Sequence, residues 1–440
     1  PAGREFGSDE GSVMIIRKAA YGLKSSGNSW RQVMSQFITE TLGFQNTIAD
    51  PDVYRRESRK PDGTSYYELL LVYVDDLLCV SHNPKDVMDK IGLVWDLKDT
   101  VKEPDRYLGA NIKKRAIGFD NREVWGMDGH EYVGNAVRIV EEMLAKEEKT
   151  LRLKGTNRPF HAKYKPEVDV TPALDSKLSG RFSQLIGMLR WAVELGRVDI
   201  LLETSLLSSH LALPREGHLE AVYQVFAYLK RHQKAPIWMD DKVPTIDERQ
   251  FKVSDWSTSI YQGAYEETPP KMPKPLGNPI QMVCFVDASH ANDVVTRRSQ
   301  TGFIIYVNNS PIDWFSKKQS TVESSTFGSE FVAMRIAMER CKALRYKLKM
   351  FGFPIEGPTW MLGDNQSVVN SASLVERKLN KKHNAICFHA VREAVAAKWL
   401  MVGWEPTGSN IADIFTKVLN DETRAKLLSS IFIRLYAQED

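Results

Sequence analysis

Short apolar runs are interspersed with helix-spaced apolar positions in the first third of the chain. Between residues 13 and 145 this mixture is typical of an α+β domain rather than of a regular alternation of strands and helices. The longest run, Leu69–Val74, resumes at Leu77–Val80 after two aspartates. This pattern predicts a buried hairpin whose tip carries Asp75 and Asp76.

Helical periodicity dominates the middle of the chain. From residue 181 to 232 apolar residues recur at helical spacing, as at Leu185, Ile186 and Leu189, with an interruption at residues 213–217. The spacing predicts an all-helical lobe. Between residues 236 and 279 prolines crowd together. Because proline lacks an amide donor and fixes φ, this segment is expected to be a linker or an irregular connection.

The last third of the chain has the pattern of a compact mixed α/β domain. Apolar runs predict strands at 282–286, 302–307, 312–315 and 359–362, and helical spacing predicts a long helix over 322–351, with more helices after the last strand. The predicted fold class is therefore multidomain, with α+β and α/β parts.

Composition agrees with this division and excludes several classes of protein. The chain has 440 residues, of which 42% are hydrophobic, enough for about three domains. No apolar run approaches the ~18 residues of a membrane helix, and the polar N-terminus lacks the shape of a signal peptide, so a soluble intracellular chain is expected. The four cysteines lie far apart, which favours reduced structural thiols over disulfides or a zinc site.

Neither the net charge nor any common catalytic motif identifies the function. A net charge of +3 does not by itself indicate a nucleic-acid partner, because only clustered basic groups create an electrostatic binding surface. The chain has no G-x-S-x-G, H-E-x-x-H, Walker or G-x-G-x-x-G motif. Serine hydrolases, zinc proteases and nucleotide-fold enzymes therefore lack their usual sequence support.

Asp75 and Asp76 are the first candidate site. Adjacent carboxylates at the tip of a hairpin repel one another unless a cation lies between them, and Mg²⁺ prefers such oxygen ligands. The alternative is an ordinary turn, in which aspartate is common.

The segment Tyr73–Asp76 resembles the Y-x-D-D box of reverse transcriptases. Residues 18–30, 42–44, 49–51 and 107–109 are similar to the copia-type retrotransposon polymerase. The resemblance implies two metal ions at Asp75 and Asp76, with Tyr73 and Lys24 binding substrate. It also implies a further aspartate upstream of the first residue, so we expect a fragment of a longer protein that does not extend a primer by itself. Ser25–Gly27 differs from the family, which usually has a Gln and a Pro there.

A second candidate site consists of four widely separated acids. Asp287 and Asp364 follow predicted strands, Glu330 lies on the long predicted helix, and Asp413 lies near a helix start. A fold can bring such positions together. The alternative for each is a solvated acid or, at Asp413, a helix cap.

The sequence around these acids resembles the ribonuclease H domain of copia-type elements. The similar segments are Phe285–Ser289, Thr296–Gly302, Trp314–Gln319, Asp364–Asn365 and Ile411–Lys417. The resemblance implies that Asp287, Glu330, Asp364 and Asp413 are catalytic and hold two Mg²⁺ or Mn²⁺ ions. It also implies that Arg298 binds substrate and that His383 and His389 bind substrate or, for one of them, handle a proton. Gly328 departs from the family and is expected to cost about 1 kcal/mol in a helix.

The resemblance implies a division of the chain into five parts. They are partial reverse transcriptase fingers and palm at 1–145, a linker and helical thumb-like lobe at 146–235, a connection at 236–280, a ribonuclease H-like five-stranded domain at 281–420, and a C-terminal tail at 421–440.

The resemblance also implies a function for these parts. The expected activities are an incomplete RNA-directed DNA polymerase and a ribonuclease H. The expected partners are an RNA template, a DNA primer, an RNA–DNA hybrid and, with the upstream palm restored, dNTPs, but no membrane. The expected location is a cytoplasmic virus-like particle, the nucleus, or both. The alternatives are a non-catalytic nucleic-acid-binding relic and a free-standing hybrid nuclease.

Overall fold

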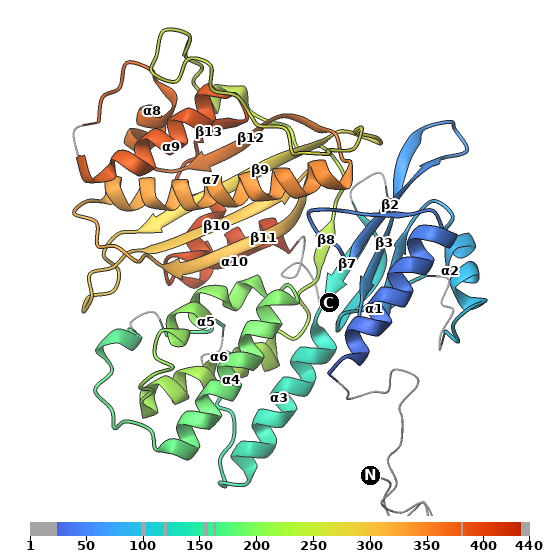
Figure 1. Cartoon of the computed structure of the whole chain (residues 1–440). Helices are drawn as coiled ribbons and strands as arrows, with labels where there is room; N and C mark the ends of the chain where they lie inside the picture. Colours follow the sequence, from blue (N-terminus) through green and yellow to red (C-terminus); the bar gives the residue numbers. More distant parts are fainter. Residues whose placement is uncertain are drawn as a thin grey trace, which may run out of the picture. The chain divides into compact units, whose positions relative to one another are not determined.

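The computed structural model describes residues 24–97, 103–117, 121–153, 157–161, 164–379 and 382–432 (Figure 1). The chain divides into two compact units. The first comprises residues 1–102 with 273–277 and 350–352, and the second comprises 103–272, 278–349 and 353–440. The predicted motif residues 18–23 lie outside the described part. In the residues that the structure describes, no helix is long and apolar enough to cross a membrane.

The first unit is a small antiparallel sheet covered by helices. The strand order is β1-β2-β3-β4. The strands are β1 Gln45–Asn46, β2 Val53–Arg59, β3 Ser65–Tyr73 and β4 Asp76–Val80, and the helices are α1 Ser26–Gln36, the π-helix η2 Phe37–Thr41 and α2 Pro84–Gly92. Its core contains Met34, Ile38, Leu70 and Ile91 from the helices and the sheet.

Strands β3 and β4 form the predicted hairpin, but only one of its faces is buried. Tyr73 pairs with Asp76, so Val74 and Asp75 form a two-residue loop, in which Val74 has a positive φ of 56°. Leu70 and Val72 are buried, whereas Leu69 and Leu71, which alternate with them, are only partly covered. The continuous apolar run predicted burial on both faces, which is wrong, because the helical core of this unit packs against one face.

The second unit begins with a four-stranded antiparallel sheet. Its order is β5-β6-β7-β8, with β5 Arg106–Tyr107, β6 Ala110–Ile117, β7 Arg122–Asp128 and β8 Ile237–Met239. Strand β8 lies inside the proline-rich segment, so the prediction of irregular structure is wrong at these three residues. Pro236 directly precedes the strand, where a missing amide donor costs no ladder hydrogen bond.

The predicted helical lobe is present. It consists of α3 His130–Ala145, α4 Ser176–Glu194, α5 Leu201–Ser208 and α6 Glu216–Arg231, with short 3-10 helices η3 Pro166–Val168 and η4 Val198–Ile200. The predicted interruption at 213–217 covers the end of the loop between α5 and α6 and the first two residues of α6, Glu216 and Gly217. Val133, Val137 and Val140 of α3 pack in the same core as α4 and α6, whereas the sequence assigned α3 to the palm part.

The C-terminal part is a mixed five-stranded sheet in the order β11-β10-β9-β12-β13. Strands β9, β10 and β11 are antiparallel, and β12 and β13 run parallel to β9. Their bounds are β9 Ile280–Ser289, β10 Gln300–Val307, β11 Ser310–Lys318, β12 Ile355–Gly363 and β13 Leu400–Trp404. The predicted mixed α and β fold class, with a five-stranded α/β sheet, is confirmed.

Helices cover both faces of this sheet (Figure 1). The helices α7 Thr326–Phe351, α8 Gln366–Ser373 and α9 Ala385–Ala396 pack on one face, and the 3-10 helix η7 Ile411–Phe415 and helix α10 Asp421–Ile431 pack on the other. The short 3-10 helices η5 Glu248–Gln250 and η6 Lys382–Asn384 complete the unit. Because both faces are covered, the central strands β9 and β10 contain continuous apolar runs, at 282–286 and 303–307.

Three element boundaries differ from the sequence predictions. Strand β9 continues to Ser289, so Asp287 lies inside the strand. Helix α7 begins at Thr326 rather than at residue 322. The expected C-terminal tail contains α10, whose Leu427, Leu428 and Ile431 are buried because helical spacing places them on one face.

Candidate active site

Two of the predicted acids lie side by side because two strands are parallel. Asp287 lies near the C-terminal end of β9, and Asp364 directly follows β12. Gly363 is in register with Val286. Parallel neighbours end at the same edge of a sheet, so the pairing alone brings the two carboxylates to one place.

The third acid, Asp413, reaches this edge on η7. Asn410 caps η7 through its side-chain oxygen, which accepts the N–H of Ala412. The amide nitrogen of Asn410 donates to the Val286 carbonyl at 3.0 Å, which attaches η7 to β9. Asn410 therefore takes the capping role that the sequence left open for Asp413.

The three aspartates form one acidic cluster. One carboxylate oxygen each from Asp287, Asp364 and Asp413 lies within 4.8 Å of the other two. The Asp287 side chain is fully buried and that of Asp413 is nearly so. We call these three residues the acidic cluster.

Glu330 faces the same cluster from α7. It is 7% exposed, and the backbone of Ala288 on β9 helps to stabilise its charged form. Burial and the charges of Asp287 and Asp364 raise its pKa well above the usual range, whereas Lys417 lowers it. The structure thus places Glu330 close enough to Asp287 and Asp364 for their charges to interact.

Lys417 and Thr416 complete the cluster, and sequence reasoning gave neither a role. The Lys417 ammonium donates to Asp413 at 2.7 Å and to Asp287 at 3.2 Å. The Thr416 hydroxyl donates to the other oxygen of Asp287. The spacing of Asp413 and Lys417, four residues apart, was the available signal, because such pairs share one side of a helical turn.

Burial and mutual repulsion act together on these acids. Burial, and then the Asp287 charge, raise the pKa of both Asp364 and Asp413, and Lys417 opposes this increase. Burial lowers the pKa of Lys417, but Asp287 and Asp413 raise it above the ordinary value overall. The site therefore contains one ammonium group and four acids, and a further cation would relieve the remaining repulsion between the carboxylates.

The donor chemistry of the cluster fits a hard divalent cation. Mg²⁺ and Mn²⁺ prefer carboxylate oxygens, and the three aspartates offer such oxygens from two strand ends and η7. Glu330 adds a fourth carboxylate beside them. We infer that these four residues are the ones able to hold metal ions here.

The first predicted pair lies elsewhere, in the first unit. Asp75 and Asp76 are both exposed at the β3–β4 turn, as are Tyr73 and Lys24. The indole N–H of Trp30 donates to the Val74 carbonyl at 2.6 Å and fixes the turn to α1. Among the described residues, neither aspartate joins a group of three potential metal ligands.

The remaining predicted substrate residues are all exposed. Arg298 lies just before β10. His383 lies 3.8 Å from the Glu323 carboxylate. The ring Nδ1 of His389 makes a 2.6 Å hydrogen bond with the Tyr261 hydroxyl, which connects α9 to the segment before β9. The roles predicted for these residues stay predictions.

Comparison with known proteins identifies a family and several relatives to which this chain is similar. Residues 1–143 match the sequence model of a family described as reverse transcriptase (RNA-dependent DNA polymerase). The chain is 23% identical to the retrovirus-related Pol polyprotein from transposon RE1 of Arabidopsis thaliana, over 93% of this chain and 24% of that protein. It is 25% identical to the corresponding polyprotein from transposon TNT 1-94 of Nicotiana tabacum, over 95% of this chain and 28% of that protein.

These relatives confirm the resemblance to copia-type retrotransposon Pol polyproteins over most of the chain. The chain spans about a quarter of their length. Similar solved structures include RNase H1 of the archaeon Halobacterium salinarum (15% identity, 31% of this chain, 94% of that chain, TM-score 0.24). Another is LC11-RNase H1 in complex with an RNA/DNA hybrid (15% identity, 34% of this chain, 100% of that chain, TM-score 0.25).

Proposed function

We propose that the second unit cleaves the RNA strand of an RNA–DNA hybrid, as the ribonuclease H part of a copia-type retrotransposon Pol polyprotein. The observation that supports this proposal is the convergence of Asp287, Asp364 and Asp413 within 4.8 Å, with Glu330 beside them. Their positions in the sequence are the four that the resemblance assigned. The sheet order and the covering helices provide the frame that holds them.

The acids have a defined task in this proposal. Two Mg²⁺ or Mn²⁺ ions, when bound, would lower the pKa of a water nucleophile and neutralise the charge on the scissile phosphate. Asp287 is held on both oxygens, by Thr416 and by Lys417, so its carboxylate has a fixed orientation. A fixed ligand requires no reorganisation when the substrate binds.

Lys417 contributes a positive charge at the same place. Its ammonium lies between Asp287 and Asp413 and reduces their repulsion in the absence of metal. It also favours the approach of a phosphate, because the field of four acids would otherwise repel a nucleic-acid backbone. The 2′-hydroxyl of RNA provides the chemical difference by which the RNA strand is distinguished from DNA.

The first unit supports a second proposed activity, as part of an RNA-directed DNA polymerase. The match of residues 1–143 to a reverse transcriptase family and the exposed pair Asp75 and Asp76 at a hairpin tip favour it. In this proposal the two aspartates bind Mg²⁺, Tyr73 and Lys24 contact an RNA template, a DNA primer or dNTPs, and the chain acts inside a larger polyprotein.

The nuclease proposal is tested with the purified 440-residue chain and a labelled RNA–DNA hybrid. We expect Mg²⁺- or Mn²⁺-dependent cleavage of the RNA strand, and no cleavage of a DNA duplex of the same sequence. Asp364→Asn should remove most of the activity, because the amide keeps the shape but not the ligand charge. A folded, metal-supplied sample that leaves the RNA intact would favour the relic alternative.

A further inference from the structure

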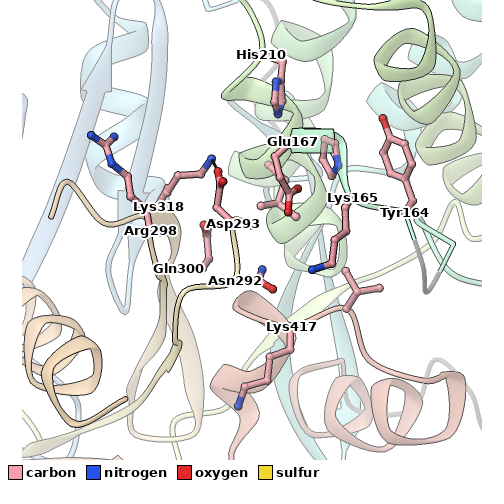
Figure 2. A pocket seen from close by; sticks show the side chains of 13 residues that line it. Tyr164, Lys165, Glu167, His210, Asn292, Asp293, Arg298, Gln300, Lys318 and Lys417 are labelled. Carbon is pink, nitrogen blue, oxygen red and sulfur yellow. Dashed lines mark hydrogen bonds and ion pairs between the residues drawn. The ribbon is translucent and has the colours of Figure 1, made fainter. Parts of the chain in front are cut away.

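A cavity of about 220 Å³ lies in the second unit, between the helical lobe and the five-stranded sheet (Figure 2). The lobe contributes Lys165, Glu167 and His210, and the sheet contributes Arg298 and Lys318. Lys417 also lines the cavity, while its ammonium bonds to the acidic cluster. The cavity therefore adjoins the proposed nuclease site and is distinct from its carboxylates.

The wall between lobe and sheet is fixed by a buried glutamine. Gln300 of β10 is 1% exposed. Its amide donates to the Ser205 hydroxyl on α5 at 3.2 Å and to the Ser316 hydroxyl on β11 at 2.9 Å. Residues from the lobe and from the sheet are thus held at constant positions around the cavity.

The acids that line the cavity are already occupied by hydrogen bonds. Glu167 accepts the backbone N–H of Val294 at 3.2 Å. Asp293 accepts an ammonium hydrogen bond from Lys318 and the backbone N–H of Thr296 at 2.7 Å. Asp293 is therefore paired with Lys318, whereas Glu167 has one backbone donor on one of its two oxygens.

Two basic side chains of the cavity, in contrast to Lys318, are not paired with an acid. Lys165 and Arg298 are exposed, and within the described part of the chain neither side chain makes a hydrogen bond or ion pair. Figure 2 shows the Lys165 ammonium pointing into the space toward Asn292, whereas Lys318 turns to Asp293. Burial and the neighbouring His218 lower the pKa of His210 to about 4, so His210 adds no charge at neutral pH.

We propose that this cavity binds a backbone phosphate of the nucleic acid cleaved at the acidic cluster, with Lys165 of the helical lobe as its principal cation. The proposal rests on the proposed nuclease function and extends it to the lobe. An unpaired ammonium that points toward the Asn292 amide matches the acceptor oxygens of a phosphodiester. A cavity of this volume holds a phosphate with several waters. The lobe is then part of the substrate site.

The test compares hybrid binding and cleavage by Lys165→Ala, Lys165→Arg and the parent, all as the 440-residue chain. Binding is measured without metal in an Asp364→Asn background, so that cleavage does not interfere. We expect Lys165→Ala to weaken binding several-fold and to reduce the slope of log K against log salt by about one. It should raise KM with kcat little changed, and Lys165→Arg should restore most of the affinity.

Lys177→Ala is the matched control, because Lys177 is an exposed lysine of the same lobe, on α4 and outside the cavity. Equal binding by Lys165→Ala and the parent, or an equal loss in the control, would overturn the phosphate site. A parent that binds hybrid without cleaving it overturns the nuclease proposal, and the binding series still decides the role of Lys165.

Inorganic phosphate should compete with hybrid for the parent and not for Lys165→Ala. Equal competition in both contradicts the assignment.

Discussion

Gly302 determines how closely η7 approaches the sheet. It lies on β10 opposite Asp287, and a Cβ atom there would lie 2.6 Å from Thr416 Cγ2 and 2.7 Å from Phe415 Cβ. These contacts are shorter than carbon atoms tolerate. The absence of a side chain at this one position therefore allows Asp413 and Thr416 to reach Asp287.

Replacing Gly302 tests this dependence. We expect Gly302→Ala to lower the free energy of unfolding by about 1–3 kcal/mol, the usual cost of overpacking, and to reduce metal-dependent cleavage by displacing Asp413. Gly180→Ala is the control, because a Cβ on this glycine of α4 meets nothing within 4 Å. That change should stabilise the chain by up to about 1 kcal/mol. Urea unfolding measures both, and an unchanged Gly302→Ala variant would contradict the argument.

Gly328 is a residue whose role depends on a long-range contact that the sequence does not reveal. Helix propensity alone assigns it a cost of about 1 kcal/mol. In the structure a Cβ atom on Gly328 would lie 2.6 Å from the Glu323 carboxylate, which accepts a 3.0 Å hydrogen bond from the buried Asn384 amide. The glycine makes room for this contact between segments far apart in the sequence, and no local pattern contains that information.

At the scale of elements, the sequence predicted the strands with long apolar runs and missed short strands such as β1, β5 and β8, which are defined by their pairing partners. Strands β9, β10 and β12 are continuous apolar runs, so their existence and approximate bounds could be predicted. The parallel pairing of β9 with β12, which brings Asp287 to Asp364, could not, because a run of apolar residues does not specify its neighbour. The spacing of Asp413 and Lys417 was the only local signal for the role of Lys417, because η7 ends at Phe415 and no helical periodicity continues to Lys417.

Helix α5 carries a buried acid whose charge depends on pH. Glu203 is 5% exposed. Burial, partly opposed by Arg424, raises its pKa from 4.5 to about 7. The folded chain then binds this proton more tightly than the unfolded chain does. The contribution of Glu203 to stability is therefore greatest below pH 4.5 and is lost as the pH rises to 7.

Substituting this glutamate should flatten the corresponding part of the stability profile. Between pH 5 and pH 8, we expect the free energy of unfolding of Glu203→Gln relative to the parent to increase by up to about 3 kcal/mol. Urea titrations at several pH values measure the difference. Glu220→Gln, on the exposed side of α6, is the control and should run parallel to the parent. A parallel Glu203→Gln curve would show that the acid is charged throughout.

At the scale of the whole molecule, the helical lobe and the five-stranded sheet belong to one compact unit. A buried polar network joins them. Arg424 of α10 donates to the Asp199 carbonyl at 2.6 Å and to the Tyr228 hydroxyl at 3.2 Å, and Tyr228 donates to the Asp199 carboxylate at 2.7 Å. The sequence predicted separate lobe and nuclease domains, because Arg424 lies 225 and 196 positions from its two partners in this network.

If this network couples the two parts, they should unfold together. We expect Arg424→Met to lower the free energy of unfolding by on the order of 3 kcal/mol, since it leaves buried polar groups without a partner. Hydrogen exchange in increasing urea should then show α6 of the lobe and β10 of the sheet losing protection at one common concentration, lower than in the parent. Glu422→Ala, an exposed change on the same helix, should leave that concentration almost unaltered. Loss of protection in α6 alone, with β10 still at the parent's concentration, would mean that the lobe is an independent domain, because one cooperative unit cannot lose half of its structure separately.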